Sequence, residues 1–427
     1  MHSWSAQGGL NPFQIARSQG CYVWDFDGKR YLDLSSQLVN TNVGHQHPKV
    51  VAAIQRQAGL LATVAPQHAT TARGEAAARI SALAPPGHDH VFFTNGGADA
   101  VENAIRMARL HTGRRKILSS YRSYHGNTGA AIAATGDPRR WQNEYAVGHV
   151  HFFGPYPYRT PFWSTSVEQE GQRALEHLAG VIALEGPDTI AAVILESVVG
   201  TGGILVPPPG YLAGVKALCA EHGIVYIADE VMAGFGRTGA WFAYEHAGID
   251  PDLIVFAKGV NSGYVPLGGV IVSDEIYDTF RDRVFPGGLT YSGHPLACAA
   301  AVATIDAMRD EGMVGNAARI GTDVLGPGLR ALAERHPVIG EVRGLGVFWG
   351  IELVTDRATR EPLAPYGGTS PAMAELVAGC LQRGVLPFTN GNRMHVVPPC
   401  IVTDDQVREG LGVLDEVLGL LDGYYTG

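Results

Sequence analysis

Cysteine is scarce in this chain of 427 residues, and its five thiols are widely spread. No two of them form a CxxC pair, which argues against a disulfide scaffold and against a zinc ribbon. None of the 16 histidines stands in HxxxH or HExxH spacing, so we expect no metal site. The thiols are Cys21, Cys219, Cys298, Cys380 and Cys400, and their isolation favours a cytoplasmic protein.

Positive charge and long apolar runs are also lacking. The chain has 32 Lys and Arg against 41 Asp and Glu, a net charge of −9, and no run of five basic residues. Nucleic acid and anionic membranes are therefore poor partners. The most apolar stretch, residues 190–206, contains Glu196 and several glycines, so it cannot span a bilayer. Residues 1–20 lack the pattern of a secretory leader.

The chain is apolar enough to bury a large core, with 46% hydrophobic residues. Short apolar runs alternate with helical patterns between about residues 60 and 310, which predicts an α/β fold with a mostly parallel sheet covered on both faces. The predicted strands are 91–94, 116–120, 191–196, 224–229, 252–256 and 269–272, and the predicted helices are 98–110, 209–222 and 295–308.

A smaller α+β unit is predicted from the two ends of the chain. Residues 21–34 alternate around an Asp-Gly turn, as in a hairpin, and residues 393–397 alternate before Pro398. We therefore expect residues 1–59 and 311–427 to share a small domain and residues 60–310 to form the large one.

Residues with reactive or charged side chains stand at the carboxyl ends of the predicted strands. Ligands of open parallel sheets bind at this edge. Residues 95–98 form a glycine turn that enters a helix, which suits a phosphate or is an ordinary loop. Tyr121 and Tyr124 could stack on a flat ring or pack on the sheet edge. Glu196 and Asp229 end buried strands, and such carboxylates need a cation, a metal or hydrogen-bond donors.

Lys258 follows another buried run, so we expect its pKa to fall and its nucleophilicity to rise. A reactive amine, carboxylates, an aromatic plate and an anion cradle on one edge are what an aldehyde cofactor with a ring nitrogen and a phosphate requires. Pyridoxal 5′-phosphate (PLP) meets all four requirements.

Two other motifs point elsewhere. Residues 234–239 match GxGxxG, which suggests a dinucleotide site, but five residues separate them from the preceding strand and the next strand ends in Lys258 rather than an acid. An NAD-dependent oxidoreductase is thus a remote alternative. Residues 224–230 look like the acidic strand of a nucleotide hydrolase, but no GxxxxGK[ST] loop accompanies them.

Longer segments resemble the class III (subgroup II, ω-type) aminotransferases, which have the type I fold of PLP-dependent transferases. The cofactor signature of that family is similar to LESVVGTGGILVPPPGYL at 195–212, YIADEVMAGFGRTG at 226–239 and PDLIVFAKGVNSGYVPLGG at 251–269. The likeness extends to residues 42–50, 92–109, 123–128, 289–301 and 343–353, and so covers nearly the whole chain.

The resemblance implies roles for individual residues. Lys258 would bind the PLP aldehyde and move the substrate proton, and Asp229 would pair with the ring nitrogen. At ~4 Å and an effective dielectric near 20, that pair is worth about 4 kcal/mol. The implied cofactor contacts also include Gly96, Gly97, Ala98, Tyr124, His125, Glu196, Val231 and Thr290, of which Thr290 would come from the neighbouring subunit of a homodimer.

The resemblance also implies a reaction and a substrate pocket. An ω-amino acid or amine of the β-alanine, GABA or taurine class would pass its amino group to pyruvate or 2-oxoglutarate by a ping-pong mechanism. A PLP-dependent mutase or phospholyase is the alternative on the same fold. Substrate contacts are expected from Leu38, Val39, Tyr121, Arg237 and Arg393, with Glu196 and Arg237 as a pair at the entrance.

Many relatives carry Arg-x-x-Pro-Pro near the end of the chain, whereas this sequence has His395 in place of that arginine. Arg393 shares a strand face with His395 and either reaches the same pocket to bind a carboxylate or is a solvated strand residue. Phe388 is a further candidate for aromatic surface in the pocket.

Overall fold

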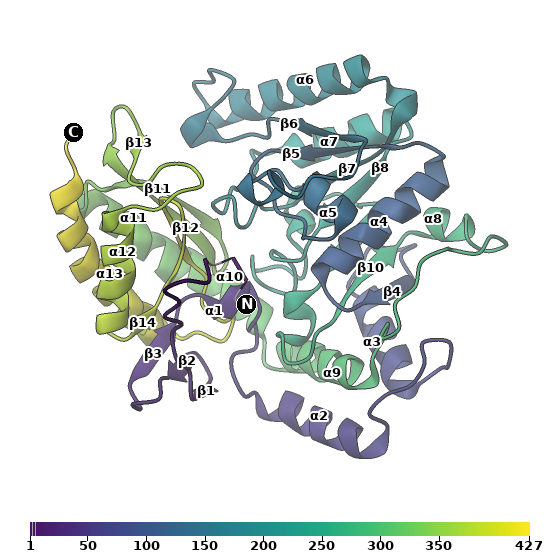
Figure 1. Ribbon diagram of the computed structural model, residues 1–427, viewed down its shortest axis with the longest axis horizontal. Coiled ribbons are helices and arrows are strands. Elements are labelled where there is room, and N and C mark those ends of the chain that lie inside the picture. The colour runs from purple at the N-terminus through teal and green to yellow at the C-terminus, as the bar shows by residue number, and fades with distance from the viewer. Residues whose placement is uncertain (2, 5) are drawn as a thin grey trace.

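The computed structural model describes residues 1–427 except residues 2 and 5, and it has a large and a small unit side by side (Figure 1). The large unit contains a seven-stranded sheet in the order β4-β10-β9-β8-β7-β5-β6. Only β10 runs antiparallel to its neighbours, so the predicted mostly parallel sheet is confirmed. The strands are β4 (His90–Thr94), β5 (Lys116–Ser120), β6 (His149–Phe152), β7 (Ile190–Glu196), β8 (Val225–Asp229), β9 (Leu253–Phe256) and β10 (Gly268–Val272).

Both faces of this sheet are covered, because successive residues of its central strands enter different cores. Ile194 and Ile227 join the cluster under α4 (Gly97–Thr112), whereas Val193 and Tyr226 join the cluster that contains residues of α6 and α7. The other helices as far as α9 are α2 (Pro48–Leu60), α3 (Thr71–Ser81), α5 (Gly129–Ala134), α6 (Val167–Glu185), α7 (Tyr211–Glu221), α8 (Asp274–Asp278) and α9 (Pro295–Asp310). The three predicted helices correspond to α4, α7 and α9.

The small unit combines strands from both ends of the chain. The N-terminal hairpin pairs β2 with β3, and the C-terminal β14 adds in parallel to β3, as Figure 1 shows by purple beside yellow-green. The first sheet contains β1 (Arg17–Gln19), β2 (Tyr22–Trp24), β3 (Arg30–Asp33) and β14 (Val385–Leu386). The second contains β11 (Ile339–Leu345), β12 (Phe348–Asp356), β13 (Glu361–Pro362), β15 (Phe388–Asn390) and β16 (Arg393–Val396). The boundaries at residues 59 and 310 remain predictions.

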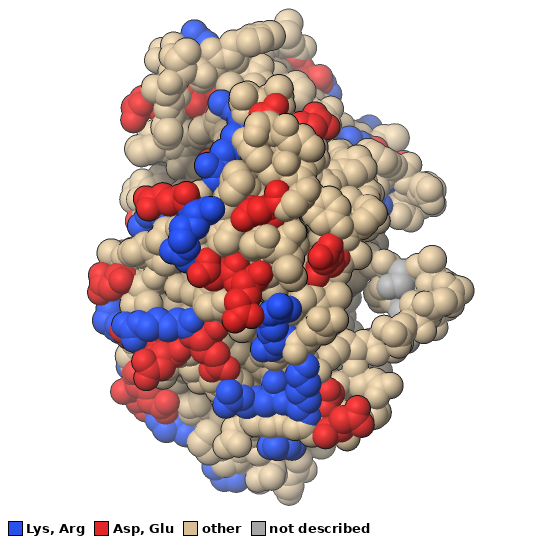
Figure 2. Space-filling view, turned by 90° about the vertical axis from the view of Figure 1, so that its left-hand side faces the viewer, with Lys and Arg blue, Asp and Glu red and all other residues tan. Residues whose placement is uncertain are grey.

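Helices cover the outer side of the small unit, and their surface carries charges of both signs (Figure 2). Ion pairs there join Arg335 to Asp415 at 2.9 Å and Arg383 to Glu416 at 2.8 Å. Such exposed pairs contribute little to the stability of the unit. The helices are α10 (Met313–Ile320), α11 (Gly326–Arg335), α12 (Pro371–Gln382) and α13 (Asp404–Leu421), and a short α1 (Ser36–Val39) precedes the large unit.

Candidate active site

The carboxyl ends of β7, β8 and β9 bring three of the predicted residues to one edge of the sheet. Glu196 and Asp229 are register partners at the ends of β7 and β8. Lys258 opens a short 3₁₀ helix, η5 (Lys258–Asn261), two residues beyond the end of β9. The prediction that strand ends gather these groups is confirmed, and it follows from the parallel direction of the three strands.

Asp229 is buried and held by two donors. Its Oδ2 lies 2.7 Å from Nδ1 of His125, and its Oδ1 accepts from the backbone N–H of Val231 at 3.0 Å. Burial lowers the pKa of His125, but the hydrogen bond and the charge of Asp229 outweigh burial, so the net shift is upward. The Nε2 of His125 is buried without a partner among the residues described. Each carboxylate oxygen of Asp229 can still accept another hydrogen bond.

Lys258 presents its amine at this edge with no hydrogen bond or ion pair from the described part of the chain. Burial lowers its pKa to about 8, helped by the charges of Arg139 and Arg237 and opposed by Glu196 and Asp229. The expected fall in pKa is therefore confirmed. Lys258 also has φ 46°, a left-handed conformation that non-glycine residues rarely adopt and that often marks functional sites.

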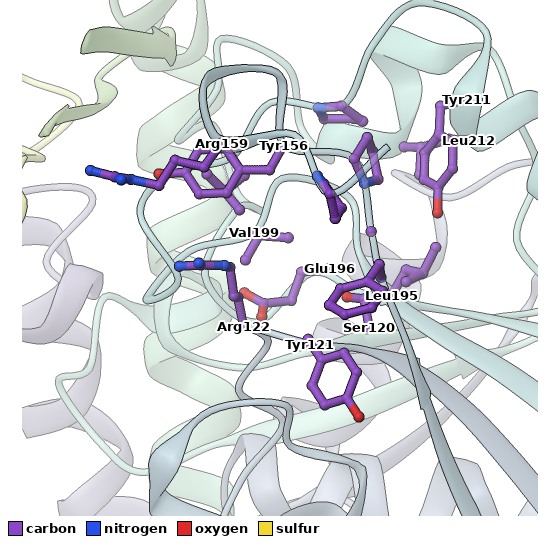
Figure 3. A pocket seen from close by; sticks show the side chains of 16 residues that line it. Ser120, Tyr121, Arg122, Tyr156, Arg159, Leu195, Glu196, Val199, Tyr211 and Leu212 are labelled. Atoms are coloured by element: carbon purple, nitrogen blue, oxygen red, sulfur yellow. The ribbon is translucent and has the colours of Figure 1, made fainter. Parts of the chain in front are cut away.

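Glu196 is fixed by backbone donors rather than by a cation. It accepts from the N–H of Tyr124 at 2.9 Å and from the N–H of Gly200 at 2.8 Å. Burial raises its pKa to about 7, with the charge of Asp229 acting in the same direction. A cavity of about 120 Å³ opens beside Glu196, with Arg122 at the same end in Figure 3 and Tyr211 at the other. Neither Lys258 nor Asp229 lines that cavity.

The turn after β4 makes a narrow cradle at the start of α4. The first N–H groups of this helix, from Gly97 and Ala98, have no acceptor within the helix and carry its positive end. A Cβ on Gly97 would lie 2.9 Å from Val231 Cγ1, and one on Gly126 would lie 2.6 Å from Ala98 Cβ. Side chains larger than hydrogen would fill this space, which suits a phosphate.

Tyr124 is half-buried and carries the Arg139 guanidinium over its ring, 3.5 Å from the centroid. Thr290 is exposed, as a contact with a second subunit would require. Among the expected substrate residues, Tyr121 is 38% exposed and stacks with His151 at 5.4 Å. Leu38 is 46% exposed, whereas Val39 is buried in a small apolar cluster that Phe388 also touches.

The expected pair of Glu196 and Arg237 is not formed. Arg237 is fully buried, and its guanidinium donates to the carbonyl oxygens of Val397 and Pro398 and, at 2.7 Å, to Asn42 Oδ1. These bonds draw the side chain toward the segment after β16, while Glu196 is satisfied by backbone N–H groups. The prediction was wrong because neither partner is left free.

Arg393 is 6% exposed, so the alternative of a solvated side chain is wrong. Its guanidinium donates to the carbonyl oxygens of Gly202 at 2.7 Å and Asn390 at 3.1 Å. Through these two hydrogen bonds, Arg393 connects the turn at residues 200–203 to the small unit. His395 is fully buried, and neither of its ring nitrogens has a partner among the described residues.

The glycines of residues 234–239 approach protein rather than open space. A Cβ on Gly236 would lie 2.8 Å from Met308 Cε, and one on Gly239 would lie 2.8 Å from the Cα of Ala318 in α10. These glycines therefore allow close packing of this turn against helices. That packing contradicts the dinucleotide alternative, because no backbone there is left for a pyrophosphate.

Sequence reasoning missed two ion pairs near the site. Asp137 caps a short 3₁₀ helix after α5, η1 (Pro138–Arg140), and forms an ion pair with Arg139 inside that helix. Glu352 of β12 pairs with Arg343 at 3.0 Å, and the charge of Arg343 holds its pKa at about 2 despite burial, which alone would raise it. The family resemblance covers residues 343–353 but assigned no role to Arg343 or Glu352, and no motif marks Asp137 or Arg139, because the partners come together only in the folded chain.

Within the part of the chain that is described, no helix is long and apolar enough to cross a membrane. No group of three or more His, Cys, Asp or Glu side chains there is placed to hold a metal ion.

The residues at the sheet edge fit PLP. Lys258 is an unpartnered amine for the aldehyde, Asp229 has acceptor capacity for a ring nitrogen, and the glycine cradle at α4 presents N–H groups to a phosphate. An amine, a carboxylate and backbone N–H groups suit an organic cofactor better than a metal ion. Side chains in place of the glycines would fill the cradle.

Comparisons with known proteins agree with this fit. Residues 4–418 match the family model "Aminotransferase class-III". A probable 4-aminobutyrate aminotransferase of Bacillus subtilis is 34% identical over 412 residues, covering 93% of this chain and 91% of the relative. A taurine–pyruvate aminotransferase of Rhodobacter capsulatus is 36% identical over 400 residues, covering 88% and 83%.

A solved structure is also similar: taurine:2-oxoglutarate aminotransferase from Bifidobacterium kashiwanohense, in complex with PLP and glutamate, has a TM-score of 0.96 and 43% identity. The match covers 99% of this chain and 96% of that one. The expected type I fold and the expected cofactor are thereby confirmed, and the NAD alternative is wrong. The chain belongs to the class III aminotransferases, which depend on PLP.

Proposed function

We propose that this enzyme transfers the amino group of a small acidic ω-amino compound, of the β-alanine, GABA or taurine class, to pyruvate or 2-oxoglutarate. The observation that carries the proposal is the unpartnered Lys258 amine beside Asp229, with an arginine, Arg139, over the neighbouring Tyr124 ring. The names of the relatives, which include a taurine–pyruvate and a taurine:2-oxoglutarate aminotransferase, support this substrate class.

The residues divide the work. PLP, when bound, supplies an aldehyde that takes up the amino group and a ring that accepts electrons. Lys258 would bind the aldehyde and, with its pKa lowered to about 8, would carry the proton that leaves the substrate carbon at near-neutral pH. Asp229, oriented by His125, would keep the ring nitrogen protonated. Tyr124 and Val231 would enclose the ring, and the N–H groups of α4 would hold the phosphate.

A ping-pong order follows from one site that serves both substrates in turn. The carbonyl product must leave before the keto acid enters. A mutase or a phospholyase, the alternative on the same fold, would use no keto acid. Thr290 would reach the phosphate of the neighbouring subunit in a homodimer. Five buried free thiols support a cytoplasmic location.

The test is a spectral assay of the holoenzyme. Adding β-alanine, GABA or taurine should shift the cofactor absorbance, and adding pyruvate or 2-oxoglutarate should restore it. Lys258→Ala should abolish the cycle. A donor panel that shifts no band, or a band that no keto acid restores, would overturn the proposal.

A further inference from the structure

Arg139 is oriented by an acidic neighbour. The Asp137 carboxylate caps η1 by accepting from the Arg139 N–H at 2.9 Å. The same carboxylate accepts from Arg139 Nε, at 3.1 Å to Oδ1 and 2.9 Å to Oδ2, and also from Nη2. This side-on pairing fixes the plane of the guanidinium more firmly than a single contact would.

The oriented guanidinium lies against one residue of the site and close enough to another to act on its charge. It covers one face of the Tyr124 ring at 3.5 Å from the centroid, a cation–π distance. Its charge also acts on Lys258, whose pKa it lowers. Arg139 therefore lies on the wall of the site where the substrate amine must react.

One edge of the guanidinium is still available. The Nη1 of Arg139 has no hydrogen-bond partner among the residues that the structure describes, and the side chain is 28% exposed. An arginine has five N–H donors, and side-on pairing with Asp137 leaves the Nη1–Nη2 edge able to bind a second anion end-on.

The other arginines near the site either bind protein groups or lie away from Tyr124. Arg237 and Arg393 are buried and donate to backbone carbonyls. Arg140 pairs with Glu144 at 2.6 Å. The Arg122 guanidinium has no hydrogen bond within the described part of the chain, but it lies over the rings of Tyr156 and Tyr366, at 5.0 and 5.2 Å, rather than over Tyr124. Arg139 alone among these combines an open donor edge, partial exposure and contact with Tyr124.

We propose that Arg139, held side-on by Asp137, is the residue that binds the acidic group of the amino donor, a carboxylate or a sulfonate. It selects donors that carry a negative charge at the end opposite the amine. The inference rests on the proposed function, since it names the contact that recognises the acidic donor. It assigns to Arg139 the role that the sequence suggested for Arg393.

The test compares an acidic and a neutral donor of the same length in Arg139→Gln. For β-alanine, KM and the spectrally measured Kd should rise roughly 10- to 100-fold, because hydrogen bonds to a charged group are lost. For propylamine, which carries no acidic group, the change should be at least several-fold smaller, because only the altered charge near Lys258 then acts on the reaction. Arg140→Gln is the matched control, and it should leave both donors unaffected.

PLP content and melting temperature of each variant establish that it is folded and loaded. Equal β-alanine and propylamine responses in Arg139→Gln would overturn the inference while leaving the proposed function intact. A wild-type enzyme that accepts propylamine but no acidic donor would instead overturn the proposed substrate class.

Discussion

His125 Nδ1 lies 2.7 Å from Asp229 Oδ2, and both side chains are buried at the carboxyl edge of the large sheet. The hydrogen bond fixes the carboxylate at the end of β8, and the N–H of Val231 holds its other oxygen at 3.0 Å. A carboxylate so placed cannot rotate away from a ring nitrogen that it meets. The pair thus fixes a carboxylate at the sheet edge where Lys258 also lies.

Asp229→Asn should slow the first half-reaction by about three orders of magnitude, since a charge pair ~4 Å apart at an effective dielectric near 20 is worth about 4 kcal/mol. The asparagine keeps the size of the side chain but not its charge. The measurement is stopped-flow absorbance with a saturating donor and PLP bound. Wild-type rates in a fully loaded variant would contradict the role of Asp229.

Gly97→Ala should weaken PLP binding roughly tenfold or more, because the new methyl group would meet Val231 Cγ1 at 2.9 Å and crowd the start of α4. Equilibrium dialysis of PLP against the apoenzyme measures the effect. Gly180→Ala is the control: nothing lies within 4 Å of a Cβ there, and Gly180 sits inside α6. That control should bind PLP normally and gain stability, whereas equal affinities in both variants would argue against a phosphate cradle.

The strands at the site were predictable because they are continuous apolar runs buried on both faces. β7 is buried at every residue, the carboxylates of Glu196 and Asp229 end such runs, and Lys258 lies two residues beyond another. β6 was not predicted, because two of its four residues are histidines, so the segment is not a continuous apolar run. Periodicity thus located the strands that are continuous apolar runs, the edge strand β4 included, and missed the one that is not.

Contacts between distant segments could not be predicted. Arg237 was expected to meet Glu196, but the carbonyl oxygens after β16 take its donors. Arg139 gave no signal in the sequence, because its importance comes from Asp137 and from Tyr124, which lies on a different loop. Residue type and position in a strand predict which side chains reach the edge of the sheet. Which of them pair depends on the other hydrogen-bond donors and acceptors that the folded chain brings near them.

Arg139→Gln should also raise the pKa of Lys258 above about 8, because the arginine charge is one of the causes that lower it. The neutral amine is the form that reacts with an aldehyde, so the pH midpoint for PLP uptake by the apoenzyme should move upward. Arg140→Gln should leave the midpoint in place. An unchanged midpoint in Arg139→Gln would mean that its charge does not reach Lys258.

His395→Leu should make the protein more resistant to acid. Burial, with the charges of Arg393 and Arg343, lowers the pKa of His395 to about 3, against an ordinary value near 6.5 in the unfolded chain. Between those two values the unfolded chain binds the proton more tightly, so wild-type stability falls as the pH drops below about 6.5.

The leucine variant lacks this loss, and at pH ~5 the difference should amount to about 2 kcal/mol in the free energy of unfolding. Denaturant or thermal unfolding at pH ~5 and ~7.5 measures it, with the exposed His68→Leu as a control that should show no such pH dependence. The benefit must shrink toward neutral pH, where His395 is unprotonated in both states. A gain that is the same at both pH values would instead reflect only the removal of two unpartnered ring nitrogens from the core.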